Sequence, residues 1–239
     1  MPPIYAVGDI HGQLGQLERV LGLIEADGGG RVVFLGDYVD RGPASSGVLQ
    51  TLVDGIADGQ DWVCLKGNHD RSMQWFLEDP PRHDPYMLIG FHWFHERIGG
   101  ATTMASYGLD LPETVRLKDF SAMAREVVPL SHQAFLKDLP LCYQTDDLFF
   151  CHAGIVPEVP LDAQDEEDLL WIRQPFHDYT RPHPKLIVHG HTPVERATHY
   201  GNRVNLDAGA GYGRDLACAV FEDGKVFALT ESGRVALTH

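Results

Sequence analysis

The sequence has few cysteines, few basic residues and no long hydrophobic run. Its 239 residues include four cysteines, and none of them forms a CxxC pair, so the chain is not a disulfide scaffold. We expect the four thiols to be reduced and mostly buried, which suits the cytoplasm. No apolar stretch approaches the ~20 residues of a membrane span, and the first residues lack the basic and apolar regions of a signal peptide. The sequence therefore predicts a cytoplasmic protein.

The scarcity of basic residues restricts the partners that we expect. Nineteen lysines and arginines stand against 34 aspartates and glutamates, which gives a formal net charge of −15. A surface this acidic repels phosphate backbones and anionic lipids, so we expect neither nucleic acid nor membrane as a partner. Bound divalent cations would offset part of this charge. The oligomeric state is left open.

Repeats, low-complexity tracts and linkers are also missing. With 44% hydrophobic and 22% charged residues, the composition is that of a globular protein. A chain of this length can bury a large core, and α/β folds reach about 250 residues as one unit. We therefore predict a single domain over residues 1–239.

The first 70 residues alternate between two kinds of hydrophobic pattern. Short apolar runs end in Gly-Asp or Gly-Asn, and between them the apolar residues recur at helical spacing. This order predicts a βαβαβ unit with parallel strands and right-handed crossovers. The predicted elements are strands at 4–7, 32–35 and 62–65 and helices at 14–24 and 44–57.

The remaining chain is predicted to begin with a mainly helical insertion at about 71–147, which is interrupted by the proline-rich stretch 79–85. Within it, His92 and His95 are expected to be interfacial helix residues, and Phe91, Trp93 and Phe94 to belong to the core or to a lid.

Strands are expected to resume at 148–151 and 186–188, with an acidic loop at 162–168 between them. The C-terminal region is expected to form strands joined by turns. Asp223-Gly224 is typical of a two-residue hairpin turn, because both positions tolerate positive φ.

Five polar clusters follow the predicted strands. Asp9 and Asp37 are 28 positions apart, and Asp37 and Asn68 are 31 apart, each about one βα unit. Such spacing brings distant residues to one edge of a sheet, where α/β proteins place their sites. Carboxylates, imidazoles and amide oxygens are ligands of divalent metals. The clusters are Asp9-Ile10-His11, Asp37 to Arg41, Asn68-His69-Asp70, His152 and His189-Gly190-His191.

Each cluster alone also fits a structural role, since a lone aspartate often caps a helix and a lone histidine is often a hydrogen-bonded core residue. The set of five, each at a strand end and flanked by glycine, is difficult to obtain from packing alone. The set therefore favours a metal site.

The motifs resemble those of the calcineurin-like metallophosphoesterases. The segments are GDIHG at 8–12, GDYVDRGP at 36–43, GNHD at 67–70, CHAG at 151–154 and HGHT at 189–192. The VDRG form is similar to the bacterial and phage-type serine/threonine phosphoprotein phosphatases, as are GGATTMASYG and WIRQPF. The resemblance extends from residue 4 to about 215. It implies an α/β fold in which two mixed β-sheets pack as a sandwich flanked by α-helices.

The resemblance also implies roles for individual residues. Two divalent metal ions would be bound, one by Asp9, His11 and Asp37, the other by Asp37, Asn68, His152 and His191. Manganese is the expected activator, and iron or zinc would also suit these ligands. Arg41 and Arg173 would bind the phosphate. His69 would be the proton donor, and Asp40 would keep its imidazole charged and oriented. Tyr212 would face the substrate. His189 would be a neighbour of the site.

The expected reaction is hydrolysis of phosphate monoesters by a metal-bridging hydroxide, with phosphoserine and phosphothreonine in proteins, or a small phosphoester, as substrate. Asp70 stands where protein phosphatases usually carry glutamate, so a symmetrical diadenosine tetraphosphate hydrolase is the alternative. A non-catalytic phosphate-binding module is a third hypothesis. It predicts missing ligands, whereas every expected ligand is present.

Overall fold

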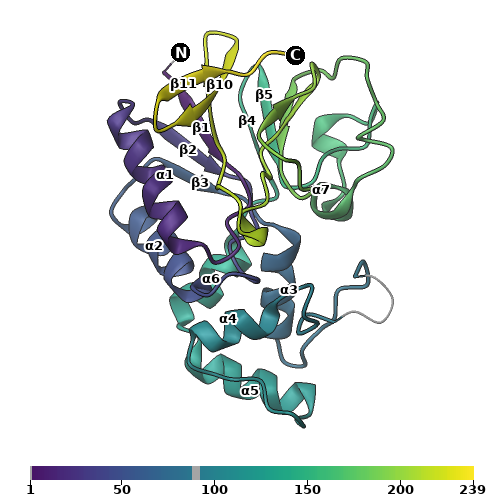
Figure 1. Ribbon diagram of the computed structural model, residues 1–239. Helices are drawn as coiled ribbons and strands as arrows, with labels where there is room; N and C mark the ends of the chain where they lie inside the picture. Colours follow the sequence, from purple (N-terminus) through teal and green to yellow (C-terminus); the bar gives the residue numbers. More distant parts are fainter. Residues whose placement is uncertain (1, 88–91) are drawn as a thin grey trace.

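The computed structural model describes residues 2–87 and 92–239 and shows two mixed β-sheets with helices on their outer faces (Figure 1). The first sheet has the order β11-β10-β9-β1-β2-β3, and the second has the order β4-β5-β6-β8-β7. This architecture confirms the predicted fold class. The strands of the first sheet are β1 (Ile4–Val7), β2 (Arg31–Phe34), β3 (Trp62–Cys64), β9 (Cys218–Glu222), β10 (Lys225–Thr230) and β11 (Gly233–Ala236).

Both ends of the chain contribute to the first sheet. Strands β1, β2 and β3 are parallel, as the sequence predicts, and β9 pairs antiparallel with β1. In Figure 1 the purple N-terminal strand accordingly lies beside the yellow C-terminal strands. The turn between β9 and β10 consists of Asp223 and Gly224 with φ values of 50° and 72°, which confirms the predicted hairpin.

The second sheet is built from β4 (Cys142–Gln144), β5 (Leu148–Cys151), β6 (Leu186–His189), β7 (Thr198–His199) and β8 (Arg203–Asn205). Strands β5, β6 and β8 are parallel, and the edge strands β4 and β7 are antiparallel to their neighbours. The short helix α7 (Glu166–Trp171) lies between β5 and β6, where the sequence analysis expected an acidic loop. That expectation was wrong for residues 166–168, because acidic residues are favourable in the first turn of a helix. Glu166 and Glu167 also form ion pairs with the buried Arg71.

Alternation along the strands divides the core into layers. Ala6 and Val33 of the first sheet face Phe150 and Val188 of the second, in a cluster between the two sheets. Their sequence neighbours point outward, so that Tyr5 joins the helix-covered cluster on the other side of the first sheet. The first sheet is therefore packed on both faces.

Helices α1 (Leu14–Ala26) and α2 (Ser45–Ala57) cover the outer face of the first sheet (Figure 1). The further helices α3 (Asn68–Phe76), α4 (Gly100–Ser106), α5 (Leu117–Val127) and α6 (Leu130–Asp138) occur where a helical insertion is predicted. They group at one end of the sheets, with α4 and α6 against α2. The carboxyl ends of β1, β2 and β3 point towards this group.

One part of the helical prediction was wrong. Residues 92–99 form consecutive turns, in which the His95 N–H donates to the His92 carbonyl and the Ile98 N–H to the His95 carbonyl. His92 and His95 are therefore not helix residues. The Trp93 side chain is buried in the core. Phe91 lies outside the described residues.

The four cysteines are free, and Cys64, Cys151 and Cys218 are buried, as expected. Among the described residues, no helix has both the length and the hydrophobicity needed to cross a bilayer.

Candidate metal centre

The polar clusters lie at the carboxyl ends of β1, β2, β3, β5 and β6, as the sequence predicts. Strained backbone conformation is concentrated there. Seven described residues other than glycine have positive φ, and five of them belong to the predicted site. A concentration of such conformations is typical of functional sites, because only a fixed surrounding structure maintains them. The five are His11, Asp37, Asp40, Arg41 and His191.

Two glycines allow the carboxylates to approach the neighbouring loops. A Cβ atom on Gly190 would overlap the Asp9 carboxylate, and one on Gly67 would overlap the Asp37 carboxylate. The contacts across these positions are hydrogen bonds from backbone N–H groups. The His191 N–H donates to Asp9 at 3.0 Å, and the His69 N–H donates to Asp37 at 3.0 Å.

Asp37 lies at the centre of the cluster. Its carboxylate oxygens are 3.6 Å from His11 Nε2 and 3.4 Å from His152 Nε2. Potential ligand atoms of Asp9, Asp37 and His152 all lie within 4.8 Å of one another. The same limit also groups His11, Asp37 and His69, although the resemblance assigns His69 to proton donation.

Asn68 joins the remaining predicted ligands to this cluster. Its Oδ1 atom is 2.9 Å from His152 Nε2 and 2.8 Å from His191 Nδ1. The structure thus brings together all six predicted metal ligands, which are Asp9, His11, Asp37, Asn68, His152 and His191, and every one is buried.

The donor atoms suit cations. The Nδ1 atoms of His11 and His152 lie 2.8 and 2.9 Å from the carbonyl oxygens of Val39 and Leu35. A carbonyl oxygen only accepts, so these nitrogens carry the proton, and in the neutral ring Nε2 presents a lone pair. The lone pair of His152 faces the oxygens of Asp37 and Asn68. Lone pairs that converge from several sides, with outer hydrogen bonds that fix the rings, are typical of metal ligands.

The electrostatics agree with this fit. Burial, followed by the nearby charges of Asp207 and Asp37, raises the pKa of Asp9 well above its ordinary value. Burial also lowers the pKa values of His11 and His191 well below the usual range. Buried carboxylates beside neutral imidazoles form a site that divalent cations would stabilise.

Beside this cluster, His69 and Asp40 form a hydrogen-bonded pair with 2.6 Å between Nδ1 and Oδ2. The Asp40 carboxylate is fully buried and also accepts hydrogen bonds from Trp93 Nε1 at 2.9 Å and Thr103 Oγ1 at 2.7 Å. Burial raises the pKa of Asp40 to about 7 and lowers the pKa of His69 to about 3. Asp40 is therefore placed to orient the imidazole, but burial opposes the charged form of His69 that is expected from the sequence.

A cavity of about 240 Å³ opens beside Asp37, Asn68, His69 and His191. Arg41, Arg173 and Tyr212 line it, as does Arg97, which the sequence analysis did not identify. The Arg41 guanidinium lies 4.8 Å from the centre of the Tyr212 ring and contacts His11 and His69. None of these three arginines forms an ion pair with a carboxylate among the described residues.

Other site residues were missed or interpreted differently. Tyr86 and Trp171 line the same cavity; Tyr86 lies in none of the motifs, and Trp171 begins the WIRQPF segment but was given no role. Asp70 does not line it; its buried carboxylate accepts the backbone N–H groups of Asp37, Tyr38 and Gly67 at 2.7–3.0 Å. Asp70 thus links the loop that follows β2 to the loop that follows β3.

His189 is a buried neighbour of the site, as expected. Its Nε2 atom is 3.2 Å from an Arg203 nitrogen, and its ring packs against Phe176 with 5.0 Å between centres. These contacts give His189 a place in the core of the second sheet.

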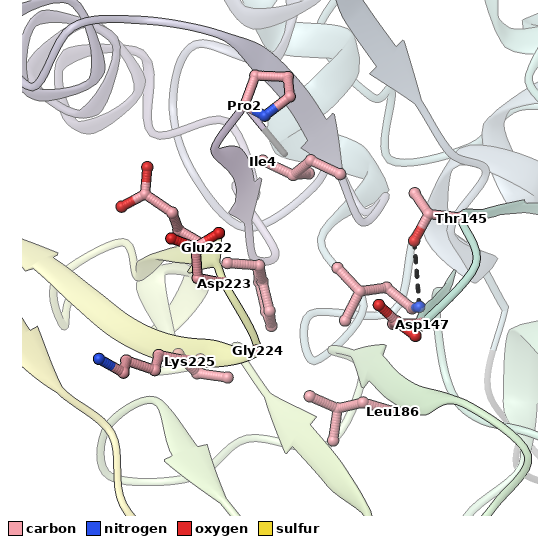
Figure 2. Close-up of a pocket in the computed structure, with 12 residues that line it drawn as sticks. Pro2, Ile4, Thr145, Asp147, Leu186, Glu222, Asp223, Gly224 and Lys225 are labelled. Atoms are coloured by element: carbon pink, nitrogen blue, oxygen red, sulfur yellow. Dashed lines mark hydrogen bonds between the residues drawn. The ribbon is translucent and has the colours of Figure 1, made fainter.

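A second cavity of about 210 Å³ lies at the opposite ends of the strands (Figure 2). Ile4, Leu148 and Leu186 line it from the starts of β1, β5 and β6, and the β9–β10 hairpin closes one side. Asp147 and Glu222 also line it. Lys225 lines it as well, but none of the six predicted metal ligands does, so the candidate metal centre belongs to the first cavity.

Comparisons with known proteins found relatives and similar folds over most of the chain. A relative from Anoxybacillus flavithermus, the asymmetrical bis(5′-nucleosyl)-tetraphosphatase PrpE, is 24% identical over 237 residues, covering 88% of this chain and 86% of the relative. A crystal structure of a candidate diadenosine tetraphosphatase superposes with a TM-score of 0.67 at 21% identity, covering 95% and 92% of the two chains. The cold-active protein tyrosine phosphatase of a psychrophilic Shewanella superposes with a TM-score of 0.61 at 18% identity, covering 99% and 80%.

The family model of the calcineurin-like phosphoesterases matches residues 2–225, which is nearly the whole chain. The match spans all five clusters, the whole second sheet, and strands β1, β2, β3 and β9 of the first sheet. This protein therefore belongs to the calcineurin-like phosphoesterase family.

Proposed function

We propose that the protein is a dinuclear metal-dependent hydrolase whose preferred substrates are dinucleoside tetraphosphates. The observation that carries the proposal is the cavity beside the metal-ligand cluster, which three arginines line without any carboxylate partner among the described residues. In a chain with a net charge of −15, arginines that remain unpaired around one cavity favour a substrate with several negative charges.

The metal ligands in this proposal are the predicted ones. Asp9, His11 and Asp37 would hold one cation, and Asp37, Asn68, His152 and His191 would hold the other. When bound, such a pair supplies a nucleophile at neutral pH and neutralises charge on the phosphoryl oxygens. Manganese is the expected activator, and iron and zinc suit the same ligands.

The arginines and the His69–Asp40 pair provide the rest of the chemistry. The planar guanidinium groups of Arg41 and Arg173 can each bind two phosphoryl oxygens, which a lysine cannot do. His69 lies next to Asp37 and can give a proton to the leaving oxygen, while Asp40 holds its ring in place. Tyr212 stacks on Arg41 and limits its movement.

A second candidate function is hydrolysis of phosphoserine and phosphothreonine in proteins. The His69–Asp40 pair favours it, because an alkoxide is a poor leaving group that needs a proton, whereas a nucleotide leaves readily as its phosphate anion. Tyr212 is 60% exposed at the rim of the cavity, where a protein surface could reach it. The similarity to PrpE over most of both chains supports the dinucleotide instead.

A substrate panel tests the proposal. The purified protein, loaded with manganese, is given diadenosine tetraphosphate or a phosphoserine peptide at equal concentrations. We expect kcat/KM to be at least about tenfold higher for the dinucleotide, equivalent to 1.4 kcal/mol. Activity on the peptide alone would replace the first function with the second. No turnover of either compound with any divalent metal would support a non-catalytic phosphate-binding module. Two ADP molecules identify symmetrical cleavage, whereas ATP and AMP identify asymmetrical cleavage.

A further inference from the structure

Two aromatic rings at the mouth of the active-site cavity have no role in the phosphoryl chemistry described above. Tyr86 is 51% exposed and Trp171 is half-buried, and both line the cavity that contains Asp37 and His69. Their ring centres are 6.4 Å apart and their planes differ by 23°. Two nearly parallel rings therefore lie at the entrance, beside the phosphate-binding arginines.

A single buried guanidinium positions both rings. Arg71 is completely buried and binds Asp84 at 2.9 Å and Glu167 at 2.8 Å. Asp84 accepts the backbone N–H of Tyr86 at 3.0 Å, and Glu167 belongs to the helix that ends at Trp171. Arg71 thus ties the two ring-bearing segments to each other. Fixed positions are a requirement for a binding surface, because they reduce the entropy lost on binding.

Trp171 extends from the entrance to the metal-ligand cluster. Its ring lies 5.8 Å from the ring of His191 in an edge-to-face arrangement at 82°. Its indole Nε1 atom is buried and has no hydrogen-bond partner in the described part of the chain. A buried N–H without an acceptor is unfavourable in a folded protein, so this donor is available to a ligand.

We propose that Tyr86 and Trp171 form a stacking subsite for a nucleobase of the substrate. Every nucleobase has a flat π-face and ring acceptors, which match the two rings and the free indole N–H. Arg97 lines the same cavity and would bind a phosphate away from the one that is attacked. The inference rests on the proposed function, because the base belongs to a dinucleoside polyphosphate.

Steady-state kinetics of Tyr86 variants test the subsite. Tyr86→Leu removes the aromatic face, and Tyr86→Phe is the matched control that keeps it. We expect KM for diadenosine tetraphosphate to rise about tenfold in the leucine variant and to stay near the wild-type value in the phenylalanine variant. Inorganic tripolyphosphate, which has charge but no ring, should inhibit the wild type and both variants with the same Ki. An unchanged KM in the leucine variant, or an equal loss of tripolyphosphate binding, would overturn the inference.

A binding measurement separates this inference from the proposed function. Adenosine, which has a base but no phosphate, is titrated into the protein while tryptophan fluorescence is recorded. We expect saturable quenching in the wild type and a loss of most of it in Trp171→Phe. Quenching by adenosine without hydrolysis of the dinucleotide would support the subsite and contradict the proposed function. Hydrolysis of the dinucleotide with no quenching by adenosine would support the proposed function and contradict the subsite.

Discussion

The indole Nε1 of Trp93 donates to both carboxylate oxygens of Asp40, at 3.0 and 2.9 Å. Asp40 is the residue that fixes the ring of His69, the proposed proton donor. The Thr103 hydroxyl donates to the same carboxylate. Both donors come from the region between β3 and β4. The orientation of His69 therefore depends on side chains that lie 53 and 63 positions beyond Asp40.

Trp93→Phe should impair proton donation and leave metal binding intact. The substitution keeps a buried ring but removes the hydrogen bond to Asp40, and a hydrogen bond to a charged group contributes about 1.5–3 kcal/mol. We expect kcat to fall about tenfold on a phosphoserine peptide and less on 4-nitrophenyl phosphate, whose leaving group needs no proton. Steady-state kinetics on the two substrates measure this difference, and an equal loss on both would contradict the positioning role.

Asp37→Asn should deplete both metals, because Asp37 belongs to both groups of potential ligand atoms. The matched variant is His69→Asn, which changes a neighbouring buried residue outside the predicted ligand set. We expect His69→Asn to keep two metals per chain and to lose most of its turnover. Elemental analysis of the proteins after gel filtration provides the measurement. Two metals retained by Asp37→Asn would exclude a bridging role, and metal loss in His69→Asn would make that residue a ligand.

The convergence of the candidate metal ligands could be predicted from the sequence because each one adjoins a short apolar strand. Asp9, Asp37 and Asn68 follow three such strands at intervals of one βα unit, and parallel strands bring their carboxyl ends to one edge. Glycine beside each cluster made the turns recognisable. These signals are local, so they can be recognised in the sequence without knowledge of the tertiary structure.

The supporting residues could not be predicted in the same way. Trp93 and Tyr86 come from a stretch rich in proline and aromatics, where no period of 2 or 3.6 indicates which side faces the site. Trp93 was expected to lie in the core or a lid, yet it is also a hydrogen-bond donor to Asp40. The sequence predicts an acidic loop in place of helix α7, because Arg71, the ion-pair partner of Glu166, is 95 positions away. Contacts of this kind depend on the path of the whole chain.

Arg71→Met should destabilise the fold strongly. The Arg71 guanidinium is fully buried, and its loss leaves the buried carboxylate of Asp84 without a counter-charge. Breaking a buried ion pair in this way costs about 3–5 kcal/mol. The control is Arg82→Met, whose ion pair with Glu78 is exposed and contributes about 0–1 kcal/mol. Urea denaturation at pH 7 measures both, and equal losses would contradict the structural role of Arg71.

Acid should weaken the hydrogen bonds that Tyr5 and Arg234 donate to Asp27. Tyr5 donates its hydroxyl to Asp27 at 2.8 Å, and Arg234 donates to both carboxylate oxygens at 2.9–3.0 Å. Burial acts to raise the pKa of Asp27, but the hydrogen bonds from Arg234 and Tyr5 outweigh it, so this pKa is lowered. Because the pKa of Asp27 is lower in the folded state, its ionised carboxylate stabilises the fold at pH values above its unfolded-state pKa of about 3.9.

Asp27→Asn should therefore lower the free energy of unfolding by about 2 kcal/mol at pH 7, since hydrogen bonds to a charged group are lost. The deficit relative to the wild type should shrink below about pH 4 and disappear once the pH falls below the folded-state pKa. Asp61→Asn is the control, because Asp61 pairs with Arg31 while its side chain remains 57% exposed, and little change is expected. Urea unfolding between pH 3 and 7 measures the deficit. A deficit that persists undiminished at the lowest pH would show that Asp27 acts through packing and not through its charge.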